Sequence, residues 1–438
     1  MSKRPAPRPA RMLAVSSLAH FMNDGVVFFI PVIGDLLSQD HRVSTAVITA
    51  MLTIFYLTSA GFGIVVGMLA DRIGRRGTMI ATGIATLGVS LVGFYGSLVL
   101  RGVGSDILVL VASAVAGIGS STYHPLGGSI LQRGFSPSAR GRALGVNGAF
   151  GSLGRALYPA LFFVIAALGI SRPATTLVFA GLSLLSAAII TVGLPAESSE
   201  TKARRQNAAA TAGSAGETAE APTTRLAPHS DSPVQPPSLR SLLNRSVVSL
   251  TTIAFFRSIA FIGIVSWIPI YLTTQRHAGL STGLGLTVTA MYAGGIIGQP
   301  IFGLLADRFD KRVVLAIDSL GSALGIFWFL TTTGTDVDAV LALAVFGLFT
   351  FSGFPLLLSL VADYVPRGSF ATGNALVWGI GSTGGQALGP LAASVLTAGS
   401  HANLGMAFAI LGALAAATVL ATPLLKRVPG SARMAMFG

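Results

Sequence analysis

The chain contains 438 residues, of which 52% are hydrophobic and 10% are charged, with a formal net charge of +13 and no cysteine. Soluble domains carry about 25% charged residues, so this chain lacks the polar surface that a water-facing globule of its size needs. The composition therefore predicts an integral membrane protein. It also excludes disulfides, iron–sulfur clusters and thiolate zinc sites. No lysine follows a glycine as the Walker A lysine does.

Apolar runs along the chain predict twelve membrane-spanning helices in two groups of six. A helix that crosses a bilayer needs about 20 mostly apolar residues. The first group of such runs comprises residues 12–38, 43–70, 78–99, 107–132, 142–167 and 174–193. The second group comprises residues 246–273, 281–305, 313–333, 338–362, 371–397 and 403–425. We therefore expect an all-α membrane protein with two six-helix halves, at 12–193 and 246–425.

The polar segments outside these halves predict the topology. Residues 194–245 are rich in Ala, Ser, Thr and Pro and cannot bury a core, so we expect a disordered linker there. Most Lys and Arg residues lie in the tails at 1–11 and 426–438, in this linker, and in the loops on the same side of the membrane. The positive-inside rule then places both tails and the linker in the cytoplasm. The positive charge is thus a topology signal, and nucleic-acid binding is not expected.

The two halves contain related motifs. The segment from Gly67 to Arg76 returns as Gly303 to Arg312, 236 residues later, and each copy follows the second helix of its half. Phe29-Ile30-Pro31 in the first helix corresponds to Trp267-Ile268-Pro269 in the seventh. Duplicated halves with a binding site between them are the usual plan of secondary transporters.

Ionisable side chains at membrane depth are costly and are functional candidates. His20 and Asp24 are four residues apart and therefore share one face of the helix 12–38. In the helix 107–132, His124 precedes Pro125, which kinks the helix and frees carbonyl groups. Asp24 must be paired, hydrated or protonated, which is the behaviour of a proton carrier. We expect Asp24, His20 and His124 to couple proton movement, and the alternative is a structural His20–Asp24 pair.

Two equivalent helices carry polar stripes that predict a shared central cavity. Asn147, Gly151 and Arg155 form one stripe, and their repeat partners are Trp378, Ser382 and Gln386, extended by Asn374. Arg155 has no carboxylate on its own helix, so it either pairs with Asp24 or holds an anionic group of a substrate. We expect the substrate to contact Arg155, Asn147, Tyr123, Asn374, Trp378, Gln386 and Arg257.

Two further ionisable residues lie within the C-terminal spans. Arg257 is predicted either to bind an anion or to extend along its helix to the membrane surface. Asp318 lies in a helix that is expected to be peripheral, so a structural role is predicted for it.

The duplicated loops Gly67-x-x-x-Asp71-Arg72-x-x-Arg75-Arg76 and Gly303-x-x-x-Asp307-Arg308, on a six-plus-six plan, resemble the major facilitator superfamily. The resemblance covers nearly the whole chain outside the tails and the linker. It implies alternating access and a latch that closes the cytoplasmic side in the outward-facing state. The latch residues would be Asp71, Arg72, Arg75, Arg76, Asp307 and Arg308. The alternative is that these charges only anchor the topology.

Within that superfamily, His20-x-x-x-Asp24 and His124-Pro125 resemble the fosmidomycin-resistance branch of exporters. This resemblance implies proton-driven efflux of small, often anionic compounds. Arg155 departs from the small residue expected at that position, which leaves the substrate open.

The first functional hypothesis is a proton-coupled antiporter that exports a small anionic or amphipathic compound, with the proton gradient as its energy source and no cofactor. The second is a symporter or uniporter for a carboxylate or similar anion, with Arg155 or Arg257 as the anion clamp. The third is a non-transporting membrane sensor or scaffold. An enzyme is not expected, because no metal cluster, nucleophile triad or phosphate loop is found. We expect a monomer in the inner (plasma) membrane, whose partners are protons, lipid and a small-molecule substrate.

Overall fold

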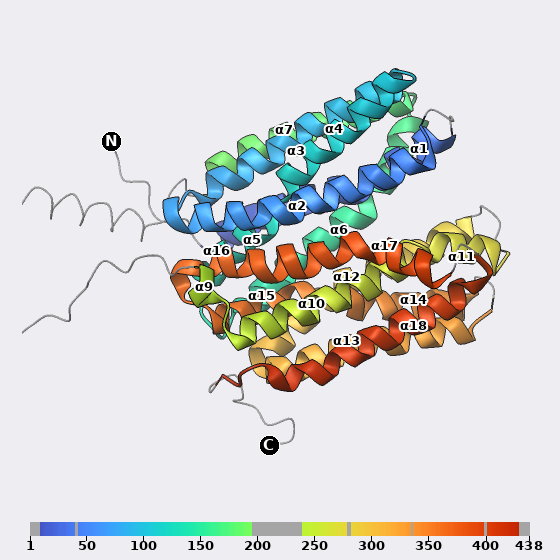
Figure 1. The fold of residues 1–438 in the computed structure, drawn as a ribbon. Coiled ribbons are helices and arrows are strands. Elements are labelled where there is room, and N and C mark those ends of the chain that lie inside the picture. Colours follow the sequence, from blue (N-terminus) through green and yellow to red (C-terminus); the bar gives the residue numbers. More distant parts are fainter. Residues whose placement is uncertain are drawn as a thin grey trace, which may run out of the picture.

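The computed structural model describes residues 9–39, 43–194, 239–277, 282–333, 336–397 and 401–428. Within these residues the chain is helical, and no strand occurs. Figure 1 shows two helical bundles side by side, one from each half of the chain. The predicted all-α class is confirmed.

The N-terminal half forms one bundle. Its helices are α1 (Pro9–Gln39), α2 (Thr45–Ile73), α3 (Arg76–Val99), α4 (Val103–Ser120), α5 (Tyr123–Gly134), α6 (Arg140–Ala167) and α7 (Arg172–Gly193). The helices α4 and α5 are two parts of one spanning segment, Val103–Gly134. The break falls just before Pro125, which lacks the N–H that would continue the helical hydrogen bonds.

The C-terminal half repeats this plan with more interruptions. Its elements are α9 (Leu239–Leu242), α10 (Arg245–Val265), α11 (Ile268–Thr274), α12 (Thr282–Arg308), α13 (Lys311–Thr331), α14 (Val337–Thr350), α15 (Gly353–Tyr364), η1 (Arg367–Ser369), α16 (Phe370–Asn374), η2 (Ala375–Thr383), α17 (Gly384–Leu396), η3 (His401–Asn403), α18 (Leu404–Ala417) and η4 (Thr418–Leu424). The break between α14 and α15 precedes Pro355, as the α4–α5 break precedes Pro125. The repeat seen in the sequence therefore extends to the interruptions of the helices.

Eleven helical segments of the described chain are long and apolar enough to cross a bilayer. The remaining predicted span, 371–397, is present as α16, η2 and α17 in direct succession, and η2 is a π-helix of 9 residues. The π-helix has a wider hydrogen-bond spacing and often occurs at functional sites. The interruption explains why this span is not one regular helix.

The segment between the halves is only partly described. Residues 195–238 of the predicted linker, and the tail residues 1–8 and 429–438, lie outside the described residues. The short helix α9 forms at Leu239–Leu242, and α10 begins at Arg245, one residue before the predicted start of that span at 246. Asn244 caps α10 by accepting a hydrogen bond from the Val247 amide, which sets where that helix begins.

The two halves meet through repeat-related helices. The helix α6 packs against α12, and α2 packs against α16 and η2. In Figure 1 the bundles lie closest at the end that holds α5, α9 and α16, and they diverge toward the end that holds α11. The α6–α12 approach depends on glycine, since a Cβ on Gly303 would collide with the carbonyl oxygen of Gly141.

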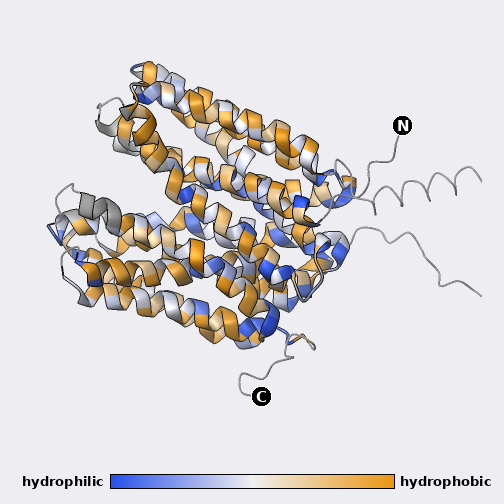
Figure 2. Cartoon of the chain, turned by 180° about the vertical axis from the view of Figure 1, so that it is seen from behind, coloured by the Kyte–Doolittle hydropathy of each residue, from blue (hydrophilic) through white to orange (hydrophobic). Residues whose placement is uncertain are grey.

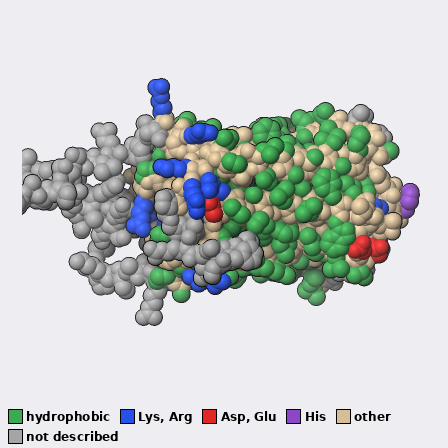
Figure 3. Space-filling view, turned by 90° about the horizontal axis from the view of Figure 1, so that it is seen from below, with side chains coloured by type: hydrophobic (Ala, Val, Ile, Leu, Met, Phe, Trp, Pro, Cys, Tyr) green, Lys and Arg blue, Asp and Glu red, His purple; other side chains and the backbone are tan. Residues whose placement is uncertain are grey.

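Charge is unevenly distributed along the bundle. We call the end with the exposed residues Arg72, Arg75, Arg142 and Arg308 the basic end. Figure 3 shows Lys and Arg gathered at one end of the molecule, with hydrophobic side chains over the middle of this face. Figure 2 shows the same division, with hydrophobic residues along the length of the helices. This is the surface of a multi-pass membrane protein.

Candidate functional site

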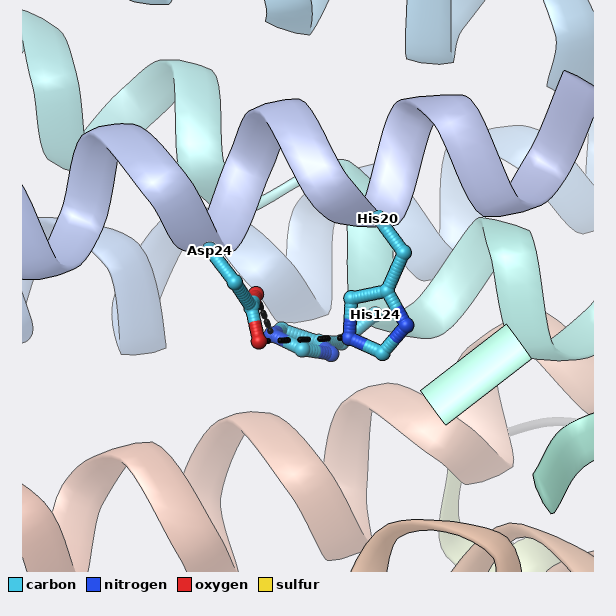
Figure 4. A group of neighbouring side chains, drawn as sticks. All are labelled: His20, Asp24 and His124. Carbon is cyan, nitrogen blue, oxygen red and sulfur yellow. Dashed lines mark ion pairs between the residues drawn. The ribbon is translucent and has the colours of Figure 1, made fainter. Parts of the chain in front are cut away.

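Asp24 lies at the centre of a cluster of ionisable side chains. Its Oδ2 atom is 3.3 Å from His20 Nε2 and 3.1 Å from Arg155 Nη2, and its Oδ1 atom is 3.4 Å from His124 Nε2. Asn23 Nδ2 also donates a hydrogen bond to Oδ1 over 2.9 Å. Figure 4 shows His20 and Asp24 side by side on one helix and facing His124. The three residues predicted for proton coupling are therefore brought together, and Arg155 joins them.

The local packing explains how His20 reaches this position. Gly151 of α6 faces α1, and a Cβ there would collide with the imidazole of His20. Glycine in the middle of the polar stripe therefore provides the space for the ring. His20 also stacks on Tyr123, with 4.6 Å between the ring centroids.

Asn147 holds His20 from the side opposite Asp24. His20 Nδ1 lies 2.8 Å from the backbone oxygen of Asn147 and 3.1 Å from its Oδ1 atom. A backbone carbonyl can only accept, so Nδ1 must carry a hydrogen. Tyr123 donates its hydroxyl hydrogen bond to Asn147 Oδ1 over 2.9 Å. The Nε2 atom is then the ring nitrogen that faces Asp24.

Arg155 lies between aromatic rings of the two halves. Its guanidinium carbon is 5.4 Å from the ring centroid of Phe28 in α1 and 4.9 Å from that of Phe351, which follows α14. Cation–π contacts of this kind favour a desolvated guanidinium. Of the two predicted roles for Arg155, the structure shows the pair with Asp24.

A cavity of about 60 Å³ lies between the halves next to this cluster. Six of the predicted site residues line it, three from each half: Asp24, His124, Arg155, Arg257, Trp378 and Gln386. Its volume has room for a few water molecules, whereas cavities that hold drug-sized ligands measure about 300–1,000 Å³. The cavity is therefore smaller than a typical site for a drug-sized ligand.

Three residues predicted to contact substrate lie elsewhere. Asn147 and Tyr123 are fully buried behind His20, where they position its ring. Asn374 forms a reciprocal amide pair with Gln132 of the other half, with N–O distances of 2.9 and 3.1 Å. Gln132 is not among the predicted site residues, because a single buried glutamine in an apolar helix carries no pattern.

Arg257 does not extend to the membrane surface, contrary to one of its two predicted roles. Its Nη2 atom lies 2.5 Å from Asp318 Oδ2 and donates to the backbone oxygens of Thr350 and Phe349 over 2.9 and 3.1 Å. Asp318 is fully buried. A buried charge requires a partner, and each of these residues supplies it for the other.

The predicted latch contains two equivalent contacts between the halves. Asp71 at the end of α2 accepts hydrogen bonds from the backbone amide and the hydroxyl of Thr372 in α16, over 2.8 and 2.9 Å. Asp307 at the end of α12 accepts from the backbone amides of Gly141 and Arg142 in α6, over 2.6 and 2.8 Å. Each carboxylate therefore binds the N-terminal turn of a helix, where exposed amides favour negative charge.

The basic residues predicted for the latch differ in position. Arg76 is buried and lies 2.6 Å from Asp71 Oδ1, so it orients that carboxylate. Arg72, Arg75 and Arg308 are exposed and form no ion pair within the described part of the chain. Positively charged residues at this end satisfy the topology rule without contacting the other half.

The His20–Asp24–His124 cluster could also hold a metal ion, because its ligand atoms lie within 4.8 Å of one another. The Nδ1 hydrogen bond of His20 to a carbonyl is the support that metal-binding histidines use. However, Arg155 is 3.1 Å from the same carboxylate, and its positive charge opposes a divalent cation at this position. The residue set therefore fits a proton better than a metal ion.

The fold and site together define a class of protein: a membrane transporter, with ionisable groups at a cavity between two repeated six-helix halves. The family model of the Major Facilitator Superfamily matches residues 13–377 and 277–434, and the chain belongs to this superfamily.

Curated relatives are similar over parts of their length. The chain is 34% identical over 141 residues to an uncharacterized protein of Archaeoglobus fulgidus, an alignment that covers 32% of this chain and 64% of that protein. It is 32% identical over 152 residues to the multidrug resistance protein MdtG of Escherichia fergusonii, which covers 32% of this chain and 35% of that protein. The chain thus matches less than two thirds of the length of either relative. The narrower resemblance to fosmidomycin-resistance exporters stays a prediction.

Solved structures share the whole fold at low identity. The proton:xylose symporter XylE bound to 6-bromo-6-deoxy-D-glucose has a TM-score of 0.72 at 15% identity, over 94% of each chain. The human organic anion transporter MFSD10 (TETRAN) has a TM-score of 0.67 at 18% identity, over 96% of this chain and 100% of that one. These similarities confirm the predicted major facilitator fold.

Proposed function

We propose that this protein is a proton-coupled transporter of a small organic anion, with Asp24 as the proton carrier and Arg155 as the anion-binding residue. The observation that carries the proposal is the 3.1 Å contact between Arg155 Nη2 and Asp24 Oδ2 at the cavity wall. Each of these buried side chains neutralises the other. A ligand of either one must therefore change the state of the other.

The pair makes a proton and an anion bind together. A proton on Asp24 removes its negative charge and releases the guanidinium of Arg155, which can then bind a carboxylate or phosphonate. By linkage, an anion on Arg155 stabilises the proton on Asp24 by the same factor. Binding of both ligands in one state is the property of a symporter. The geometry thus favours the second functional hypothesis from the sequence.

The histidines provide a route for the proton. The side chain of His124 is 15% exposed and lines the cavity, while His20 is fully buried on the far side of Asp24. A proton from the cavity would reach His124 Nε2 or Asp24 Oδ1 first. His20 Nε2 would then stabilise the ionised carboxylate from the opposite side.

Antiport is a second candidate, supported by the relatives named multidrug resistance proteins. In an exporter driven by protons, the substrate would compete with the proton for Asp24. Such a substrate would be a cation or a neutral amphipathic molecule rather than an anion. In both candidate functions the basic end is expected to lie in the cytoplasm, so the latch would close the cytoplasmic side.

The direction of proton movement separates these functions. Monocarboxylates, dicarboxylates or amphipathic cations would be added outside proteoliposomes loaded with the pH-sensitive dye pyranine, whose fluorescence measures the pH of the lumen. A symporter acidifies the lumen when its substrate enters, whereas an antiporter makes the lumen more alkaline. We expect acidification by carboxylates in the native protein and none in Asp24→Asn.

The matched control is Asp338→Asn, since Asp338 is an exposed acid at the end opposite the basic end. This variant should acidify the lumen at the native rate. Full proton movement in Asp24→Asn would contradict the assignment of Asp24. An alkaline shift with cations alone would establish the antiport candidate in its place.

A further inference from the structure

The central cavity is lined by two guanidinium groups, one from each half of the transporter. Arg155 belongs to α6 of the N-terminal half, and Arg257 belongs to α10 of the C-terminal half. Both side chains are at least nine-tenths buried, with 9% and 4% of the residue exposed. Two buried cations on the wall of one small cavity repel each other unless anions are nearby.

Each arginine is held by a carboxylate of its own half. Asp24 contacts Arg155 over 3.1 Å, and Asp318 contacts Arg257 over 2.5 Å. These carboxylates differ in one respect, because Asp24 lines the cavity whereas Asp318 is fully buried and is not part of its wall. A proton from the cavity can therefore reach Asp24 directly.

Both guanidinium groups retain unused hydrogen-bond donors. The Nε atoms of Arg155 and Arg257 are buried and have no hydrogen-bond partner among the described residues. Buried polar groups in native proteins are nearly always paired. An oxyanion in the cavity is the acceptor that such donors bind best, since hydrogen bonds from a guanidinium to a negatively charged oxygen are short and strong.

The wall of the cavity offers few other charges. Asp24 is the only carboxylate among the described residues that line it. When Asp24 is protonated, the two arginines face the cavity with no ionised acid beside them on its wall. Arg257 keeps its contact with Asp318 through Nη2. A ligand with one negative charge would bind Arg155 and would leave the Nε donor of Arg257 without an acceptor.

We propose that the transported anion carries two acidic groups, one bound by Arg155 and the other by Arg257. This inference rests on the proposed function, because it takes Arg155 and protonated Asp24 as the anion site. A compact dicarboxylate suits the cavity of about 60 Å³ better than a drug-sized molecule. A ligand that contacts both halves also has a different affinity for the open and closed states, which transport requires.

The test compares ligands that differ by a single charge. Calorimetric titration of the purified protein at pH 7 would use malonate, succinate, glutarate and adipate, each beside its monoamide of the same shape. We expect one dicarboxylate to bind about tenfold or more tightly than its monoamide, as a charged hydrogen-bonded pair implies. No binding by any of the four dicarboxylates, or equal binding of each acid and its monoamide, would overturn the proposal.

Variants then assign the second charge to Arg257. Because Arg257→Gln alone leaves Asp318 buried without a partner, the informative variant is Arg257→Gln combined with Asp318→Asn. This double variant should lower dicarboxylate affinity to the level of the monoamide and leave monoamide affinity unchanged. Arg257→Lys keeps the positive charge beside Asp318 and provides a second test. We expect it to cause an intermediate loss of dicarboxylate affinity.

The outcomes also separate this inference from the proposed function. If carboxylates still drive proton movement through Asp24 and Arg155 while the Arg257 variants bind dicarboxylates with native affinity, the two-point site is wrong and the proposed function stands. If Asp24→Asn retains full proton movement, the proposed function fails. The affinities of each dicarboxylate and its monoamide would still show whether the cavity binds two acidic groups.

Discussion

Asp71 accepts hydrogen bonds from both the backbone amide and the hydroxyl of Thr372, a residue that follows it by 301 positions and lies in the other half of the molecule. Asp307 makes the corresponding contact with the first turn of α6. The two contacts are related by the internal repeat, so at the basic end each half binds the other through a carboxylate at the N-terminal turn of a helix. In alternating access, these contacts must break whenever this end opens.

We expect Asp71→Ala and Asp307→Ala each to increase the population that is open at the basic end. A hydrogen bond to a charged group contributes about 1.5–3 kcal/mol, so each variant should shift the open-to-closed ratio by roughly tenfold or more. Because the native chain has no cysteine, spin labels at Ser138→Cys and Arg367→Cys would report the distance between the halves by pulsed electron paramagnetic resonance.

The matched control for the latch is Asp338→Asn, at the opposite end of the molecule. It should leave the distance distribution unchanged. If Asp71→Ala gives the same distribution as this control, the latch assignment is wrong.

The amide pair between Gln132 and Asn374 predicts a second contact that holds the halves together. Asn374→Ala leaves the buried Oε1 atom of Gln132 without its donor, at a cost of about 1–3 kcal/mol, whereas Nε2 still donates to the backbone oxygen of Leu358. We expect the Gln132→Ala, Asn374→Ala double variant to lose less stability than the sum of the single variants. A thermal-unfolding double-mutant cycle measures this coupling, and strictly additive losses would show that the two amides do not act as a pair.

Gly151→Ala should disturb proton coupling through His20. The added methyl group collides with the imidazole and displaces it from Asp24, and displacements of about 1 Å can lower rates by about a hundredfold. We expect proton movement in proteoliposomes to fall by about tenfold or more. Gly181→Ala is the matched control, because a Cβ at Gly181 meets no atom within 4 Å. Similar loss in both variants would argue against a specific effect on His20.

Asp310 predicts a pH-dependent contribution to stability outside the membrane spans. A hydrogen bond from the Arg312 side chain lowers the pKa of Asp310 below its ordinary value, and the carboxylate also caps α13. A lowered pKa in the folded state means that the stabilisation is present above about pH 4 and is lost as the pH falls through the folded pKa.

The corresponding variant is Asp310→Ala, which should lose about 1 kcal/mol at pH 7 through the missing cap. Thermal unfolding of both proteins between pH 7 and pH 3 would measure the difference, which should shrink as the pH falls. A difference that grows at low pH would contradict this assignment.

Local pattern was sufficient to predict much of the fold. The length of each apolar run sets whether a helix can span a bilayer, so eleven of the predicted spans appear as such in the described chain and the twelfth as α16, η2 and α17. The repeat of Asp71 at Asp307 likewise predicted two equivalent loops. The start of α10 at Arg245, capped by Asn244, lies one residue from the predicted start of that span at 246. The pattern did not predict that the π-helix η2 interrupts the span 371–397.

The sequence by itself determined that this chain is a two-half membrane protein and that Asp24, His20 and His124 are its unusual intramembrane groups. Tertiary structure alone decided their partners. Arg155 reaches Asp24 from a different helix, and Arg257 reaches Asp318 across the C-terminal bundle. Neither pair can be read from spacing, since the rotation of each helix is set by contacts such as those of Gly151 and Gly303 with helices distant in sequence. A buried charge requires a partner, but only packing selects which one.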